Sequence, residues 1–591
     1  MHRGPDAQNT YKYENVILHH LRLSILDIAT GTQPMHLNED FSIIFNGEIY
    51  NHQAIREKYH LKGVTNSDTE TILLAWQKLG AKCLDEFDGM FAFALLDKKN
   101  KKVYLVRDRA GKKPLYIYNR NNVLIFTSEL NALYRAVPLS INENHIGLYL
   151  RMGSFFREQT PYNDVMELTN GQMAEYCLNN NTLEFRNWWQ IEAFYNCKSH
   201  LSESDTLTKI DELLDNAVKS RIDSSDLEVG AFLSGGIDSG LVVAKAARYV
   251  DDLKTFTVRF SGLYDESELA LSVAKKFKTR HTVLDIDLSN LKYDIEKILH
   301  NYGEPFFDSS AIPSYYVSKS AKEHVTVVLN GDGADELFGG YRRFVPFAKY
   351  DFFSAPKRLK LFSNGLSKLL PPAHTKQSKY NYLHRLVSLI GKPVDEMFLA
   401  STVDIFEGYL NGLNKQYLEH GTQTLSHFIR SRFNKNQTGL QKLMLLDFDI
   451  NLFDDLLVKI DIATMAHSLE GRSPFLSKEF LEFAPTISDK LKIHNTTTKV
   501  LLRKLAERTL PPEIAIQPKR GFEVPLKKWV NNDLKEVIYD NIMSSDAYHS
   551  QYVNKPFFEK LLNKKLSISE EKRAKMIWTI YSLDNWYKRL K

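Results

Sequence analysis

The pattern of hydrophobic and polar residues changes near residue 200 and divides the chain into two parts. The first part contains short apolar runs of the strand type, separated by Asn, Gly and Asp, at 16–26, 41–50, 91–97, 101–108 and 122–129. A single helix is predicted among them, at 69–80. Many strands with few helices predict a layered domain of packed sheets. The polar, non-periodic stretch 196–206 marks the expected boundary, so we predict domains at 1–200 and 201–591.

The second part alternates strands with helices. Strands are predicted at 227–233, 253–260, 281–287 and 325–333, with helices at 240–250 and 266–277 and a further helical stretch before the last strand. This alternation is typical of a parallel sheet with crossover helices. After residue 341 the pattern is nearly all helical. The expected fold class is α+β for the first domain and α/β, with a helical C-terminal part, for the second.

Composition and charge narrow the class of protein. The chain has 591 residues, 43% of them hydrophobic and 25% charged, which is enough apolar material for more than one core. The net charge of +5 shows no basic tail or stripe, so we expect no nucleic acid partner. The first 15 residues lack the apolar segment of a secretion signal, and no apolar run reaches the roughly 18 residues that cross a bilayer. We therefore expect a cytoplasmic protein with no membrane segment.

The three cysteines give no sign of a metal or disulfide framework. Cys83, Cys177 and Cys197 are widely spaced, which excludes a zinc ribbon and fits a reducing compartment. We interpret them as structural thiols.

The stretch SGGIDSG, residues 234–240, follows the first predicted strand of the parallel sheet and opens its first helix. Ligand sites of open α/β sheets lie at this edge. Gly235 and Gly236 allow backbone N–H groups to approach an anion, Ser234 and Ser239 add hydroxyls, and a helix N-terminus favours negative charge. Neither a Walker loop nor G-x-G-x-x-G occurs in the chain, so we expect a loop that holds pyrophosphate while the α-phosphorus is attacked. A plain strand-to-helix turn is the alternative.

The string SGGIDS resembles the pyrophosphate loop of N-type ATP pyrophosphatases, and the whole chain resembles the glutamine-dependent asparagine synthetases. Three further stretches carry the resemblance: NGDGADELFGGY (330–341), DDLLVKIDIATMAHSLEGRSPFL (454–476), and the run from TTKVLLRKL (497–505) to PPEIAIQPKRGFEVP (511–525). Asn330 stands where a serine is usual, and Ile462 replaces the usual arginine. An acidic glycine turn is the alternative for 330–341.

The resemblance implies a nucleotide site in the second domain. The residues that it assigns to ATP and pyrophosphate are Leu233, Ser234, Gly235, Gly236, Asp238, Ser239, Val258, Asn330 and Gly331. Leu233 and Val258 would line the adenine pocket, and simple sheet core is the alternative for both.

The resemblance also implies three catalytic residues and a metal site. Asp332 matches an acidic position implicated in forming the acyl-adenylate, and Lys499 is expected to stabilise negative charge at the reacting phosphate. Arg503 follows four residues later, on the same face of a predicted helix, where a solvated face is the alternative. Asp238 and Asp335 are expected to hold Mg²⁺, because hard carboxylates and phosphate oxygens suit that ion.

The stretches RLSILD (22–27), FNGEIYNH (45–52), NSDTE (66–70) and RDRAGKKPLY (107–116) resemble the glutaminase domain of the same family, an N-terminal-nucleophile hydrolase. The roles that this resemblance implies are glutamine carboxylate binding by Arg22, an oxyanion hole from Asn46 and Gly47, and binding of the amino acid end by Glu48 and Asp68. Taken alone, FNGEIYN could be an Asn-Gly hairpin turn.

The cysteine nucleophile of such domains is not at its expected place. These domains begin Met-Cys-Gly, whereas residue 2 here is His2, and Cys83 follows a predicted helix. Loss of a nucleophile cost on the order of 10⁶ in rate in another hydrolase. Two hypotheses stay open: a start codon assigned too late, which we favour because the glutamine-pocket residues are present, or a protein that uses free ammonia. An in-frame Met-Cys-Gly upstream would support the first, and a stop codon there would exclude it.

The activity that the resemblance implies is ATP-dependent amidation of aspartate through β-aspartyl-AMP, with release of AMP and pyrophosphate. The expected partners are small molecules, namely aspartate, glutamine or ammonia, and ATP with Mg²⁺; a homodimer stays open. One alternative is the same chemistry on another carboxylate, such as that of a surface-polysaccharide sugar. Another is a non-catalytic binding or regulatory protein. The spacing of residues does not reveal the acceptor pocket.

Overall fold

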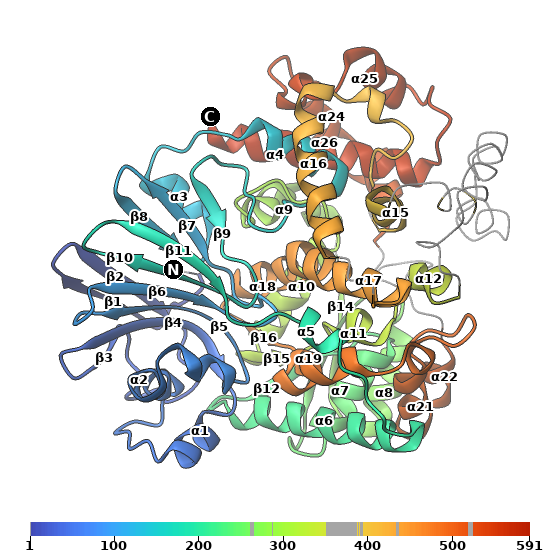
Figure 1. The fold of residues 1–591 in the computed structure, drawn as a ribbon. Helices are drawn as coiled ribbons and strands as arrows, with labels where there is room; N and C mark the ends of the chain where they lie inside the picture. Colours follow the sequence, from blue (N-terminus) through green and yellow to red (C-terminus); the bar gives the residue numbers. More distant parts are fainter. Residues whose placement is uncertain are drawn as a thin grey trace.

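The structure is a computed structural model, and it describes residues 2–259, 265–286, 288–349, 387, 389, 394–402, 404–432, 436–517 and 524–591. The ends of the predicted strands at 260 and 287, the helical pattern in most of 350–393 and the motif residues 518–523 lie outside this described part. In Figure 1 the strands of the first domain lie on one side of the molecule, beside the parallel sheet and the helices of the second domain.

The first domain is built on antiparallel sheets. A six-stranded sheet has the order β11-β10-β6-β5-β4-β3, a three-stranded sheet the order β8-β7-β9, and β1 pairs with β2. The strands are β1 (Ala7–Tyr13), β2 (Val16–Arg22), β3 (Met35–Leu37), β4 (Phe41–Ile49), β5 (Gly89–Asp97), β6 (Lys102–Arg107), β7 (Tyr116–Arg120), β8 (Val123–Thr127), β9 (Val165–Glu167), β10 (Gln172–Cys177) and β11 (Thr182–Asn187). The helices are α1 (His52–Tyr59), α2 (Asp68–Leu79), α3 (Leu130–Ala136), α4 (Glu143–Met152) and α5 (Glu192–Tyr195).

The central strand β5 explains why its sequence is apolar throughout. Successive side chains of a strand point to opposite faces of the sheet. Phe91, Phe93 and Leu95 pack into a core shared with helix α2, whereas Ala92 and Ala94 pack into a second core shared with strands β2 and β7. Both faces of the six-stranded sheet are therefore covered, and the predicted layered domain is confirmed.

The second domain contains a five-stranded parallel sheet with the order β14-β13-β12-β15-β16. Its strands are β12 (Val229–Phe232), β13 (Lys254–Arg259), β14 (Arg280–Asp285), β15 (Val327–Leu329) and β16 (Glu470–Arg472). Because the chain proceeds from β12 outward in one direction and resumes at β15 on the other side, the strand order reverses between β12 and β15. Ligands of open α/β sheets bind at such a switch point, outside the carboxyl ends of the strands.

Strand β16 was not expected from the sequence, because the region after residue 341 has a helical pattern. It has only three residues and pairs in parallel with β15, with Leu329 opposite Arg472. A three-residue strand carries no readable period, so the long-range partner decides its conformation.

Helices form most of the described remainder of the second domain, as predicted. The helices around the sheet are α6 (Glu203–Asp223), α7 (Ile237–Ala246), α8 (Ser267–Phe277), α9 (Leu288–His300), α10 (Ala311–Lys322), α11 (Ala334–Phe338) and α12 (Val345–Lys349). The later helices are α15 (Val394–Ser401), α16 (Lys415–Ser431), α17 (Gly439–Leu446), α18 (Val458–Met465), α19 (Lys478–Phe483), α20 (Asp489–Lys492), α21 (Val500–Thr509), α22 (Pro512–Ile516), α23 (Leu526–Lys528), α24 (Lys535–Ile542), α25 (Lys555–Leu562) and α26 (Glu570–Leu590). A π-helical segment at Asp447–Leu457 joins α17 to α18. Within the described part of the chain, no helix is both long and apolar enough to cross a membrane.

Candidate active sites

The two glycine-containing loops of the second domain meet at the switch point of the parallel sheet. Residues 233–236 connect β12 to α7, and residues 330–333 connect β15 to α11. A Cβ atom on Gly331 would lie 2.9 Å from the Cβ of Asp238 and 3.1 Å from the backbone nitrogen of Ser239. Only glycine therefore permits this contact, which brings the two signature loops together.

Hydroxyl groups brace the first loop from within. The Oγ atoms of Ser234 and Ser239 lie 2.9 Å apart, and the backbone N–H groups of Ser234 and Gly236 donate to the Ser239 and Ser234 hydroxyls, respectively. Gly235 packs against α8, where an added Cβ would lie 2.7 Å from the Cβ of Leu269. The loop is thus held in one shape at the N-terminus of α7, a location that favours an anion.

Lys499 lies between the two carboxylates expected to hold a metal. Its Nζ is 2.6 Å from Oδ2 of Asp238 and 2.6 Å from Oδ1 of Asp335. The expectation that Lys499 and Arg503 share a helix face needs correction, because Lys499 precedes α21 in a left-handed conformation, with φ of 53°. A Cβ on Gly340 would lie 1.7 Å from Oδ1 of Asp335 and 2.4 Å from Cε of Lys499, so this site is closely packed.

The two carboxylates fit a Mg²⁺ site that substrate completes. No group of three or more potential ligands occurs among the described residues. Mg²⁺ is commonly bound by one or two carboxylates together with phosphate oxygens and waters, so the convergence of Asp238 and Asp335 suits it.

The other residues assigned to this site lie nearby, with different partners. Arg503 donates to the carbonyl oxygens of Thr498 and Ala515, at 3.0 and 2.8 Å. Leu233 and Val258 are 1% and 7% exposed, and both side chains pack in hydrophobic cores. Their packing in this structure therefore matches the alternative interpretation, simple sheet core.

Asn330 ties the second loop to β16. Its backbone N–H donates to the carbonyl oxygen of Arg472 at 2.9 Å, and its side-chain oxygen accepts from the hydroxyl of Ser473 at 2.7 Å. The Asn330 amide nitrogen is buried and has no hydrogen-bond partner among the described residues. An amide donor is therefore available at this position of the loop.

All five residues assigned to glutamine line one cavity of about 1150 Å³, which lies mainly against the first domain and is also lined by second-domain residues such as Glu470 and Met465. The cavity lies against residues 19–23, which belong mainly to β2, and residues 125–129, which belong mainly to β8. Asn46 and Gly47 are inside strand β4, with Gly47 opposite Phe91, so the hairpin-turn alternative for FNGEIYN is wrong. Gly47 has φ of 142°, and a Cβ there would lie 2.0 Å from the carbonyl oxygen of Met90.

Arg22 and the carboxylates of this cavity are positioned by protein groups. The Arg22 guanidinium donates to the carbonyl oxygens of Leu26, Asp27 and Ile28, at 2.7–3.2 Å. Asp68 accepts a 2.9 Å hydrogen bond from the backbone N–H of Ile49. The loop 26–28 thus fixes the direction of the guanidinium.

Burial raises the pKa of two carboxyl groups that line the cavity, those of Glu48 and Asp68. Burial raises the pKa of Asp68 to about 6, although the N–H of Ile49 and a hydrogen bond with Glu48 oppose the shift. For Glu48, burial is again the main cause, the neighbouring Asp68 adds to it, and its pKa lies well above the ordinary value. Both carboxyl groups therefore hold a proton more tightly than free carboxyl groups do.

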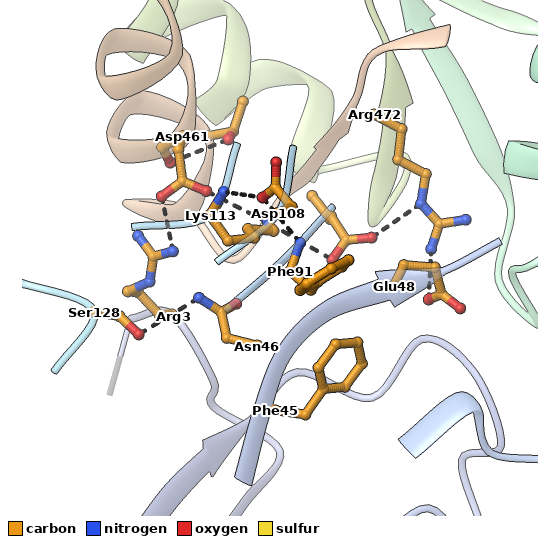
Figure 2. A network of polar contacts seen from close by, with 12 residues as sticks. Arg3, Phe45, Asn46, Glu48, Phe91, Asp108, Lys113, Ser128, Asp461 and Arg472 are labelled. Atoms are coloured by element: carbon orange, nitrogen blue, oxygen red, sulfur yellow. Dashed lines mark hydrogen bonds and ion pairs between the residues drawn. The ribbon is translucent and has the colours of Figure 1, made fainter. Parts of the chain in front are cut away.

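A buried chain of charged residues extends from Glu48 across the domain boundary, as Figure 2 shows. Glu48 lies 3.1 Å from Arg472, which is 2.9 Å from Glu470. Lys113 is 3.9 Å from Glu470 and 3.4 Å from Asp461. These residues lie in the motifs quoted above, but apart from Glu48 the sequence pattern predicted no role for them. The signal that could have found them is charged residues inside otherwise apolar motifs.

The cysteines take no part in either site. Cys83 follows α2, and burial raises the pKa of its thiol, which suits an inert structural group. Cys177 is partly exposed, Cys197 is exposed, and none of the three lines the cavity described above.

Comparison with known families assigns both parts of the chain. A family described as "Asparagine synthase" matches residues 209–588, and one described as "Glutamine amidotransferase domain" matches residues 1–189. The fold and these matches define a carbon–nitrogen ligase that carries a glutamine amidotransferase domain.

Individual proteins show the same likeness over nearly the whole chain. "Asparagine synthetase [glutamine-hydrolyzing] 1" of Bacillus subtilis (strain 168) is 32% identical over 600 residues, which cover 99% of this chain and 92% of that protein. A putative second asparagine synthetase of Methanocaldococcus jannaschii is 33% identical over 497 residues, covering 78% of this chain and 93% of that protein. The chain belongs to the asparagine synthase family, which is ATP-dependent.

Among solved structures, one titled as the allosteric regulatory enzyme of purine biosynthesis is 13% identical, with a TM-score of 0.23. The match covers 46% of this chain and 66% of that one, a likeness too weak to carry an argument.

Proposed function

We propose that the second domain, residues 201–591, joins the β-carboxylate of aspartate to AMP and then to ammonia, giving asparagine, AMP and pyrophosphate. The observation that carries the proposal is the position of Lys499 between Asp238 and Asp335 at the switch point of the parallel sheet. A cation and a metal-binding carboxylate pair beside an anion-binding loop suit an attack on the α-phosphorus.

Each step uses groups at this site. The N–H groups of the 233–236 loop and the start of α7 bind the pyrophosphate portion of ATP, and Lys499 stabilises the negative charge that develops at the reacting phosphate. Asp238 and Asp335 would hold Mg²⁺, which neutralises the phosphates when bound. Asp332, Asn330 and Arg503 border the place where the acyl-adenylate forms. Activation of the carboxylate replaces one difficult displacement with two easier ones.

The first domain, residues 1–200, is proposed to bind glutamine in the cavity that Glu48 and Asp68 line. Arg22 would bind the glutamine carboxylate, Glu48 and Asp68 its amino acid end, and Asn46 with Gly47 would form the oxyanion hole. None of the described residues that line this cavity is a cysteine. We propose glutamine as the nitrogen source, or free ammonia if the N-terminal cysteine is truly absent. A cytoplasmic location belongs to the same proposal, and a homodimer stays open.

The test is to measure AMP and pyrophosphate release by the purified chain with ATP, Mg²⁺ and an ammonium salt, with and without aspartate. Release that depends on aspartate supports the proposal. If release requires a carboxylate other than aspartate, the proposed acceptor is wrong. If ADP and orthophosphate form instead, the adenylation mechanism is wrong. Substitution of glutamine for ammonium, in parallel, determines the nitrogen source.

A further inference from the structure

The loop after strand β6 is shaped by one buried carboxylate. Oδ1 of Asp108 accepts from the backbone N–H groups of Ala110 and Lys112 at 3.0 Å, and Oδ2 accepts from those of Phe91 and Lys113 at 3.0 and 3.1 Å. Four hydrogen bonds to one buried group fix the loop backbone. The directions of its two lysines are therefore set within the first domain.

The same loop is docked on the second domain. A Cβ on Gly111 would lie 2.4 Å from the ring of Phe453, and the Lys113 ammonium lies 3.4 Å from Asp461. Gly111 has φ of 74°, a conformation that favours glycine. Close backbone approach and a buried ion pair hold the loop against the ligase domain.

The neighbouring lysine, Lys112, reaches the proposed adenylation site. Its side chain is 4% exposed, and its Nζ lies 3.5 Å from Oδ2 of Asp332, whose side chain is 29% exposed. Neither Nζ of Lys112 nor Oδ2 of Asp332 has a hydrogen-bond partner among the described residues. A buried ammonium without hydrogen bonds is costly for folding alone, so its position calls for another role.

We propose that Lys112 is a positioning residue of the ligase reaction, which holds the carboxylate of Asp332 from the first domain. The inference rests on the function proposed above. The ammonium attracts the carboxylate without using all its N–H groups, because 3.5 Å is long for a hydrogen bond. N–H groups of Lys112 and carboxylate oxygens of Asp332 therefore stay available to bind substrate, because the Asp332 side chain is partly exposed. The adenylating site is complete only when the glutaminase domain is docked.

The test compares ammonia-dependent pyrophosphate release by the whole chain with that of Lys112→Met and Lys112→Arg. Lys112→Met is expected to lower kcat at least tenfold, with the KM for ATP within twofold, because the nucleotide loop is untouched. Lys112→Arg keeps the positive charge and is expected to recover to within about threefold of the unaltered chain. Lys99→Met, at an exposed lysine of the same domain, is the matched control and is expected to leave kcat unchanged.

A second measurement separates positioning from folding. Thermal melting and the rate of proteolysis in the 196–206 stretch report whether the domains stay folded and docked. Equal melting and proteolysis with reduced kcat supports the inference. If Lys112→Met keeps kcat within twofold, or loses it together with domain docking, the inference is overturned. If the unaltered chain releases no AMP and pyrophosphate, the proposed function itself fails, so the two failures are distinguishable.

Discussion

Arg472 and Glu48 lie 3.1 Å apart, nitrogen to oxygen, across the boundary between the parallel-sheet domain and the antiparallel-sheet domain. Arg472 is fully buried, and its carbonyl oxygen accepts from the backbone N–H of Asn330 in the nucleotide loop. Glu48 lines the proposed glutamine cavity. One residue thus contacts both proposed sites, with its backbone at one and its side chain at the other.

Replacement of Arg472 by Met should destabilise the protein strongly. The substitution would leave Glu48 and Glu470 without their shared cation in a buried environment, and breaking a buried pair in this way costs about 3–5 kcal/mol. Urea unfolding measures the loss of unfolding free energy. Arg186→Met removes an arginine from an exposed pair with Glu184 and should change it by less than about 0.5 kcal/mol. A loss below about 1 kcal/mol for Arg472→Met would show that the buried chain of charged residues contributes little to the free energy of unfolding.

Replacement of Lys499 by Met should make stability depend on Mg²⁺. Without the ammonium, the carboxylates of Asp238 and Asp335 repel each other, and a divalent cation can compensate. The melting temperature of the variant should fall in EDTA and recover with Mg²⁺, and pyrophosphate release should fall by roughly 10²-fold or more. Lys490→Met, at an exposed lysine, is the control. Equal melting of Lys499→Met with and without Mg²⁺ would contradict the metal assignment.

A methyl group at Gly340 should damage the ligase site selectively. The added Cβ would lie 1.7 Å from Oδ1 of Asp335 and must displace that carboxylate or Lys499. A displacement of about 1 Å can cost roughly 10²-fold in rate, so Gly340→Ala should lower kcat by roughly ten- to a hundredfold. Gly471→Ala adds the same group where the nearest atom is 3.5 Å away and should retain activity. Comparable activity of the two variants would argue against this tightly packed site.

The Asp68 carboxyl should make stability decrease with rising pH. Because its pKa is raised to about 6 in the folded chain, its contribution is present below its unfolded pKa near 4 and lost as pH rises through 6. Relative to Asp68→Asn, the unaltered chain should lose about 1–2 kcal/mol between pH 5 and 8.

Urea unfolding from pH 5 to 8 measures this slope. Asp546 provides the control, because hydrogen bonds from Lys591 and Ser544 lower its pKa to about 2, outside the measured range. Asp546→Asn should therefore leave the slope between pH 5 and 8 unchanged. An identical slope for Asp68→Asn and the unaltered chain would show that Asp68 ionises normally.

The order of strands and helices could be predicted where each element is long enough to show its own period. The alternation after residue 227 gave the parallel sheet, and the strand-to-helix position of Gly235 and Gly236 gave the candidate phosphate loop. The three-residue strand β16 could not be predicted, because its conformation depends on pairing with β15. The sequence pattern predicts a helical backbone at Lys499. In the structure its backbone is left-handed, and its side chain lies between two carboxylates.

The sequence by itself determined most of the elements and the signature loops through local period and residue type, and its resemblance to a known family indicated the polar residues of each proposed site. Only the tertiary structure decided that β12 and β15 are neighbours, that Arg472 joins Glu48 to the nucleotide loop, and that Lys112 lies beside Asp332. Glu48 and Arg472 are more than 200 positions apart, as are Lys112 and Asp332, and the other contacts depend on the order of the strands in the sheet. The spacing of residues along the chain carries no information about either.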